Sequence, residues 1–378
     1  MTFKLLLLLF IVFYVLKKEK IFHLDKTFED KSKYLKLKGI DYLHNSYVGT
    51  LKSPEMIFRI QMGNANKRDI EVLKQRFLDA VMNKDNFTYY KTDSKYYVQY
   101  VNKNDLHKCF LKTPPKSTGH ILELIKKSEI QTLISIHDKT GDIYFAWNHG
   151  ILEGLGSMKL FKQVLDDSAC CTELKPYYLN VKLFIYSLTK CKLKKQNEPI
   201  PINLKTSYNL SFILPDFVIK NISKENGISF NSSLIYYILK LLKVTDCVIA
   251  TILPGIKTTD HNSYGIIPFN YHYCDNAKEI EEKINNNYCF SYISNIYLLN
   301  YHLIHKEIPT TIDIIFSGFS VAKEEPKIGD MIFKSCILYN PNQSTPVSVF
   351  SCKFKDQVQV SISIKNKDVL DAVKKQIH

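Results

Sequence analysis

The chain has 378 residues, 45% of them hydrophobic and 23% charged, which excludes a disordered or fibrous chain and predicts two domains at ~100–200 residues each. The 51 Lys and Arg residues outnumber the 37 Asp and Glu residues, and the net charge of +14 favours a polyanionic partner. The lysines are scattered and form no Arg-rich block, so we expect no nucleic acid partner. None of the nine cysteines forms a C-x-x-C pair, so we expect no metal site and free thiols in a reducing compartment.

The amino terminus carries an unbroken apolar run at residues 5–16, followed by Lys17 and Lys18. The run is shorter than the ~20 residues that span a bilayer. It has the size of a signal-peptide core, but no small-residue cleavage site follows it. We therefore expect residues 1–20 to be a membrane anchor or an uncleaved signal-like segment, with the main body in the cytoplasm. A cleaved signal peptide is the alternative.

The first half, residues 35–190, mixes strands and helices. Apolar residues recur at helical spacing over 67–82, whereas the strands show alternating or β-branched patterns. The predicted strands are 55–62, one or two within 89–101, 132–135 and 142–147; the predicted helices are 67–82, 122–130 and 156–165.

A polar, proline-broken linker is predicted at 191–205, and a second half follows at 206–378. Its predicted helices are 217–226, 232–243, most of 280–305, and 368–377; its predicted strands are 247–253, 312–316, 331–338, 347–354 and 357–364. The fold class is therefore α/β or α+β, with mixed sheets and flanking helices in each half. Two such halves meeting face to face would leave a cleft or tunnel, and domain interfaces are common ligand sites.

The segment 143–157 is the strongest functional signal. It runs apolar and aromatic into His149, with Glu153 four residues later and glycines at 150 and 154. Histidine has an unperturbed pKa of ~6.5 and can take and return a proton near neutral pH. On this spacing alone, a structural histidine at a strand end is the alternative to a general base.

This segment resembles the H-H-x-x-x-D-G signature of acyltransferases that share the chloramphenicol acetyltransferase fold. Other segments match blocks of that superfamily in the same order, closest to the wax ester synthase/diacylglycerol acyltransferase branch: 37–44, 222–240, 262–268, 312–318 and 346–364. The resemblance covers roughly residues 35–378. It implies two similar domains of that fold with an active-site tunnel between them.

The resemblance implies that His149 is the catalytic base and that Asn148, Glu153 and Gly154 support it. Asn148 replaces the first His of the signature, and Glu153 replaces its Asp. Glu153 is expected to pair with a basic side chain and hold the turn. Two further departures lie in the second half, at Ser232 and Gly318.

Three residues are possible contacts to the substrate or the developing oxyanion by type and position: Asn231, Asn270 and Ser317. For Asn231 a helix N-cap is the alternative role, since Asn is well suited to that position.

The implied activity is transfer of a fatty acyl group from acyl-CoA to a lipid-like alcohol, with no resident cofactor. The expected partners are acyl-CoA, a hydrophobic alcohol and a membrane surface, at the cytoplasmic face of the endoplasmic reticulum. One alternative is a catalytically weakened relative that binds acyl chains or a protein partner. Another is a condensation-type enzyme that acts on carrier-protein thioesters.

Overall fold

The computed structural model describes ten segments of the chain, and all structural statements below refer to them: 34–36, 55–83, 89–90, 97–148, 164, 208–254, 264–287, 312–322, 327–339 and 345–377. The predicted anchor 1–20, the linker 191–205 and nearly all of the helix at 156–165 lie outside these segments. No helix within them is long and apolar enough to cross a membrane.

The first half is built on a five-stranded antiparallel sheet with the order β11-β12-β2-β6-β5. Its strands are β2 (Glu55–Gly63), β5 (Thr132–Ile136), β6 (Ile143–Asn148), β11 (Lys327–Ile328) and β12 (Met331–Tyr339). One face packs on helix α3 (Lys67–Asn83), whose predicted apolar stripe is buried, and the other on α4 (Thr118–Lys127). A short 3-10 helix, η2 (Lys103–Cys109), precedes α4.

A small three-stranded antiparallel sheet lies beside this one. It consists of β1 (Tyr34–Lys36), β3 (Tyr89–Tyr90) and β4 (Tyr97–Tyr100), in the order β1-β4-β3. A bridge between Tyr90 and Ile130 joins it to the residues just before β5.

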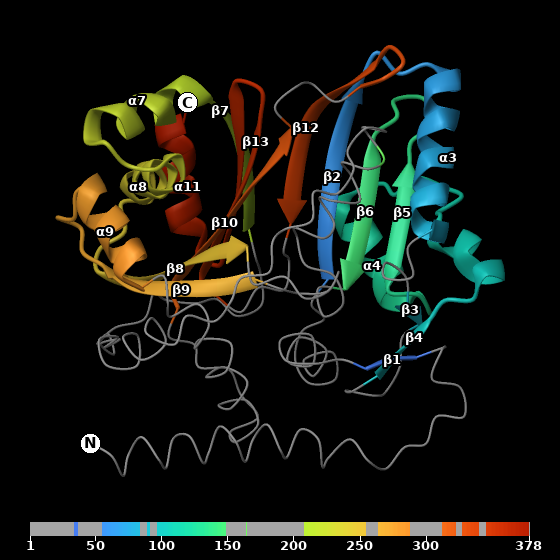
Figure 1. The fold of residues 1–378 in the computed structure, drawn as a ribbon, viewed down its shortest axis with the longest axis horizontal. Helices are drawn as coiled ribbons and strands as arrows, with labels where there is room; N and C mark the ends of the chain where they lie inside the picture. Colours follow the sequence, from blue (N-terminus) through green and yellow to red (C-terminus); the bar gives the residue numbers. More distant parts are fainter. Residues whose placement is uncertain are drawn as a thin grey trace, which may run out of the picture.

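The second half is built on a six-stranded mixed sheet with the order β7-β14-β13-β10-β8-β9. The central strand β10 runs parallel to β13 and β8, and the other pairs are antiparallel. The strands are β7 (Tyr208–Pro215), β8 (Cys247–Pro254), β9 (Tyr264–Tyr271), β10 (Ile314–Ala322), β13 (Val347–Phe354) and β14 (Gln357–Ile364). One face is covered by helices α7 (Asp216–Asn226), α8 (Phe230–Leu242), α9 (Ala277–Asn287) and α11 (Lys367–Ile377), all on the left in Figure 1.

The hydrophobic core of the first half extends into the second half at strand β13. Along β13, Val347 and Val349 pack under the helices of the second half, whereas Phe350, Cys352 and Phe354 join the core of the first half. A strand that buries alternate residues on both faces reads as a nearly continuous apolar run, as β13 does. The ribbon in Figure 1 shows the two sheets side by side between the outer helices.

The C-terminal half of the sequence also donates strands to the first half. Strand β12 pairs with β2, with Ile332 opposite Gly63, although 332 − 63 = 269 residues separate them in the chain. Phe333 of β12 meets Phe354 edge-to-face at 4.8 Å between ring centroids, and the backbone N–H of Cys336 donates to Oε1 of Gln359 at 3.0 Å. The sheet of the first half thus contains strands from both sides of the predicted boundary at 191–205. The linker itself stays a prediction.

Most predicted elements are confirmed within a few residues, and the α/β class with flanking helices is confirmed. The sheet of the second half is mixed as expected, whereas the two sheets of the first half are antiparallel. Helix α4 begins earlier than predicted because Ser117 is its N-cap, with Oγ accepting from the backbone N–H of His120 at 3.1 Å. The predicted strand at 312–316 instead runs from Ile314 to Ala322. Of the predicted helix 280–305, the structure describes α9 as far as Asn287. Strand β9 overlaps the block 262–268 of the resemblance, whereas β1, β7 and β11 were not predicted.

Candidate active site

The end of strand β6 marks the candidate site. Asn148, its last residue, is 5% exposed and lies opposite Glu55 of β2, and its backbone N–H donates to the carbonyl of Gln131 at 3.0 Å. His149, Glu153 and Gly154 follow in the sequence and lie outside the described residues, so their roles stay predictions. The structure therefore fixes the point from which the chain enters the motif.

This strand end is held by aromatic packing. Trp147 is 1% exposed, and its ring stacks on those of Phe58 and Phe145, each at 5.0 Å between centroids. Phe145 and Trp147 belong to the core that also holds Phe350 of β13, whereas Ala146 faces α4. Asn148, the residue before His149, thus ends a strand that is buried on both faces.

Asn231 lies in α8 but is not its N-cap, which corrects that prediction. The cap is Ser229, whose Oγ accepts from the backbone N–H of Ser232 at 3.2 Å. The Ser229 hydroxyl also donates to the Ser232 hydroxyl at 3.0 Å. Ser232, which stands where the related motif has an acid, is thus part of the helix start and is 1% exposed.

Asn231 comes close to strand β10 at Gly318. A Cβ built on Gly318 would lie 3.8 Å from Oδ1 of Asn231 and only 2.6 Å from Oγ of Ser351 on β13. A contact of 2.6 Å is shorter than real side chains adopt, so a larger residue at this position would force the Ser351 side chain to move. The departure at Gly318 therefore has a local structural reason.

Ser317 lies on the opposite face of the same sheet. It pairs with Phe350, which belongs to the core shared with the first half, and paired residues point to the same face. Ser317 therefore lies on the face of the sheet that packs on the first half, whereas Asn231 lies on the face covered by the helices.

Asn270 lies on the edge strand β9 and is half-buried. It pairs with Val248, and none of the described residues donates a hydrogen bond to its Oδ1, which is fully buried. Its neighbours Phe269 and Tyr271 pack under the helices, so Asn270 shares the face of Ser317.

The sheet register separates Asn270 from Ser317. Asn270 pairs with Val248 of β8. Because Ile249 pairs with Ile314, Val248 lies at the level of Asp313. Ser317 is four residues further along the same chain segment. At ~3.3 Å per residue and ~4.8 Å between strands, the two Cα atoms are roughly 16 Å apart. The structure therefore does not bring Asn270 and Ser317 together on one reacting atom.

Two buried ionisable groups near β9 are poor candidates for chemistry. Burial raises the pKa of the Cys247 thiol well above its usual range, so the thiol stays protonated and is not an activated nucleophile. Burial also raises the pKa of Tyr271 to about 12. Within the described part of the chain, no group of three or more His, Cys, Asp or Glu residues could hold a metal ion.

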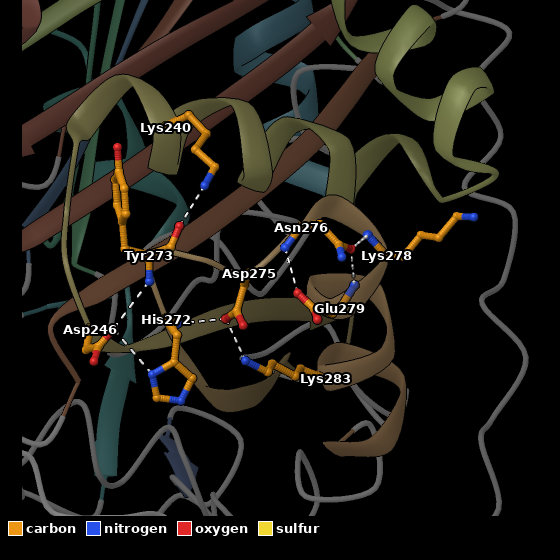
Figure 2. Close-up of polar contacts among 9 residues, drawn as sticks. All are labelled: Lys240, Asp246, His272, Tyr273, Asp275, Asn276, Lys278, Glu279 and Lys283. Atoms are coloured by element: carbon orange, nitrogen blue, oxygen red, sulfur yellow. Dashed lines mark hydrogen bonds and ion pairs between the residues drawn. The ribbon is translucent and has the colours of Figure 1, made fainter.

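A polar cluster at the turn between β9 and α9, absent from our predictions, is shown in Figure 2. The carboxylate of Asp275 is 6% exposed and accepts from the backbone N–H of His272 at 2.6 Å and from Nζ of Lys283 at 2.5 Å. Asp246 accepts from the backbone N–H of Tyr273 at 3.3 Å and lies 3.3 Å from Nδ1 of His272. These bonds fix the turn and leave its carboxylates engaged.

The start of α9 completes this cluster. Oδ1 of Asn276 accepts from the backbone N–H of Glu279 at 3.0 Å, and Oε2 of Glu279 accepts from the backbone N–H of Asn276 at 2.7 Å. This reciprocal pair is a capping box. The Asn-x-x-Glu spacing could have revealed it in the sequence. We interpret the whole cluster as structural.

Comparison with known proteins gives the fold but no sequence relative. No model of a known protein family matches the chain, and no curated protein sequence matches it. Solved structures match over nearly the whole chain. The trichothecene 15-O-acetyltransferase from Fusarium sporotrichioides aligns with a TM-score of 0.61 at 11% identity, covering 90% of this chain and 94% of that chain.

Two further solved structures are similar. The wax ester synthase/diacylglycerol acyltransferase from Marinobacter aquaeolei VT8 has a TM-score of 0.55 at 11% identity, over 90% of this chain and 97% of its own. The starter condensation domain of rhizomide synthetase, solved with C8-CoA and Leu-SNAC, has a TM-score of 0.59 at 8% identity, over 91% and 92%. The resemblance stated from the sequence is therefore confirmed at the level of the fold.

Proposed function

We propose that this chain is an acyl-CoA-dependent O-acyltransferase that acts on a lipid-like alcohol, with His149 as the general base. The observation that carries the proposal is the end of β6. A strand buried on both faces, in a fold shared with acyltransferases, leads directly into the Asn-His-x-x-x-Glu-Gly segment. Because one fold hosts many activities, the residues at this strand end carry more weight than the fold itself.

The reaction needs one proton to move twice. His149 would take the proton from the acceptor hydroxyl as its oxygen attacks the thioester carbonyl carbon. When the tetrahedral intermediate collapses, the C–S bond breaks and the imidazolium returns the proton to the leaving CoA thiolate. General acid–base catalysis of this kind contributes roughly 10²–10⁴-fold in rate.

The supporting residues have distinct proposed roles. Glu153 would pair with a basic side chain, and Gly154 would permit the turn that presents His149. Ser317 is our preferred contact to the developing oxyanion, because it lies on the face of the second sheet that looks toward the first half. Asn270 would contact a more distant part of the substrate, and Asn231 would support β10 from the helix side.

The substrate class rests on charge and on likeness. A net charge of +14 suits the phosphates of CoA, and the similar condensation domain was solved with C8-CoA. The apolar run at 5–16 suits a membrane-bound alcohol, and a similar structure is a wax ester synthase/diacylglycerol acyltransferase. We therefore place the enzyme at a membrane surface, with the cytoplasmic face of the endoplasmic reticulum as the proposed location.

A second candidate is a weakened relative that binds acyl chains or a protein partner without turnover. It is favoured by the departures from the related motif, two of which the structure describes. Ser232 lies in the capped first turn of α8, and Gly318 leaves room for the side chain of Ser351. At both positions the residue that departs from the motif makes local packing or capping contacts, which acyl transfer does not require.

The test is an acyl transfer assay with labelled acyl-CoA and a panel of fatty alcohols and diacylglycerols. We expect the wild type to form ester and His149→Ala to lose at least ~10²-fold in kcat. The control is His272→Ala, which removes a histidine beside a carboxylate but far from β6 along the chain; it should retain activity. Equal ester formation by wild type and His149→Ala would refute the general base.

Glu153→Asp separates the two candidates further. A gain in rate on restoring the shorter acid would show that Glu153 limits an active enzyme. Acyl-CoA binding without any ester from the wild type or from Glu153→Asp would favour the weakened relative.

A further inference from the structure

Gln131 stands where three strands meet, next to the candidate site. Its backbone N–H donates to the carbonyl of Tyr89 on β3 at 2.9 Å, and its carbonyl accepts from the backbone N–H of Asn148 at 3.0 Å. It therefore ties the small sheet to the end of β6, one residue before His149.

The side chain of Gln131 lies beside that of Asn148. Thr132 pairs with Trp147, so the next residues, Gln131 and Asn148, are directly opposite and point to the same face. Cβ atoms of such pairs are ~4.5–5.5 Å apart. Gln131 is 3% exposed and Asn148 5% exposed, so both amides are withdrawn from solvent.

The amide oxygen of Gln131 carries an unused acceptor. It is fully buried, and within the described segments no group donates to it. Gln359 provides the contrast: it is also buried, and its Oε1 accepts from the backbone N–H of Cys336 at 3.0 Å. A buried acceptor without a donor lowers stability, and a leucine of similar shape would remove that cost. Gln131 thus lowers the stability of the fold and lies beside the strand end that carries the proposed general base. This combination points to a functional role for its side chain.

We propose that Gln131 is a positioning residue for His149. Its amide oxygen accepts a hydrogen bond from the side-chain amide of Asn148 when substrates are bound, and this fixes the direction in which the chain leaves β6. The inference rests on the proposed function, because it assigns Gln131 a role in presenting the general base.

The test compares Gln131→Leu, which loses the acceptor, with Gln131→Glu, which keeps one, and with Gln359→Leu as the matched control. Three quantities are measured: kcat and KM for acyl transfer, the melting temperature, and the pKa of His149. The last comes from an NMR titration, with CoA and a fatty alcohol bound, of the imidazole signal that disappears in His149→Gln.

We expect Gln131→Leu to lower kcat about tenfold or more, because small misplacements of a catalytic group are costly. KM should change little, the melting temperature should not fall, and the pKa of His149 should shift by a few tenths of a unit. Gln131→Glu should recover most of kcat. Gln359→Leu should lower the melting temperature, because the Cys336 N–H loses its acceptor, while the pKa of His149 stays unchanged.

Two results would overturn the inference: a Gln131→Leu variant with the wild-type kcat and His149 titration, or one that is less stable with that titration unchanged. A wild type that transfers no acyl group to any acceptor would refute the proposed function instead. The His149 titration with CoA and the alcohol bound would then still decide whether Gln131 positions that histidine.

Discussion

Trp147 offers a direct test of how firmly the end of β6 is held. The change is Trp147→Ala. A buried Trp removes ~150–250 Å² from water, which at ~25 cal/mol per Å² corresponds to about 4–6 kcal/mol as an upper value. Its side chain is 1% exposed and stacks on Phe58 and Phe145. Measured losses for such truncations are ~3–5 kcal/mol, and we expect a loss in that range from the free energy of unfolding.

The assay is urea unfolding followed by far-ultraviolet circular dichroism, because Trp147 is the single tryptophan and its removal abolishes that fluorescence signal. The control is Phe217→Ala, which removes an aromatic ring that is 60% exposed and should change stability by about 0.5 kcal/mol at most. Trp147→Phe should lose less than Trp147→Ala, since a phenyl ring keeps part of both stacks. A loss below ~1 kcal/mol for Trp147→Ala, or one no larger than that of Phe217→Ala, would refute the reasoning.

Three further predictions concern stability. Burial raises the pKa of Asp313 above its ordinary value, so the folded state loses stability as pH rises from about 4 toward that raised pKa. Asp313→Asn should therefore raise the melting temperature at pH 7 and lose this advantage near pH 3; an equal gain at both pH values would contradict it. Gly318→Ala should lower the free energy of unfolding by ~1–3 kcal/mol, because the new Cβ meets Oγ of Ser351. Adding Ser351→Ala to that variant should recover part of the loss. Purely additive effects of the two changes in urea unfolding would exclude the contact as the cause. Asp69→Ala should lower the free energy of unfolding by ~1–3 kcal/mol, because Oδ2 of Asp69 accepts from the backbone N–H of Asp330 at 3.0 Å. Asp69→Asn keeps an acceptor oxygen and should lower it less. Equal losses in the two variants would argue against that bond.

Local patterns in the sequence predicted individual elements well but not their partners. The helix over 67–82 and the strands over 347–354 and 357–364 follow their periodicity closely. Strand β7 was missed although Leu210, Phe212 and Leu214 alternate inward, because the exposed residue between the last two, Ile213, is also apolar and blurs the alternation. An alternating pattern identifies a strand, but it does not reveal which distant strand it pairs with.

The site shows the same division between local and long-range information. The sequence located the end of β6 because apolar residues run directly into the motif there. It could not separate Ser317 from Asn231, since their placement on opposite faces of the second sheet depends on register. Nor could it single out Gln131, one polar residue before a strand, because its proposed role rests on its pairing with Asn148.

The pairing of β12 with β2 has a consequence for the nascent chain. Ile332 lies opposite Gly63, 269 residues later in the sequence, and synthesis at ~5–20 residues per second takes about 13–54 s to cover that distance. During this time β2 has no neighbour on one side, and an unpaired strand edge is a template for pairing with other chains. The sheet of the first half is thus completed only after most of the second half has been synthesised, so the two halves mature together.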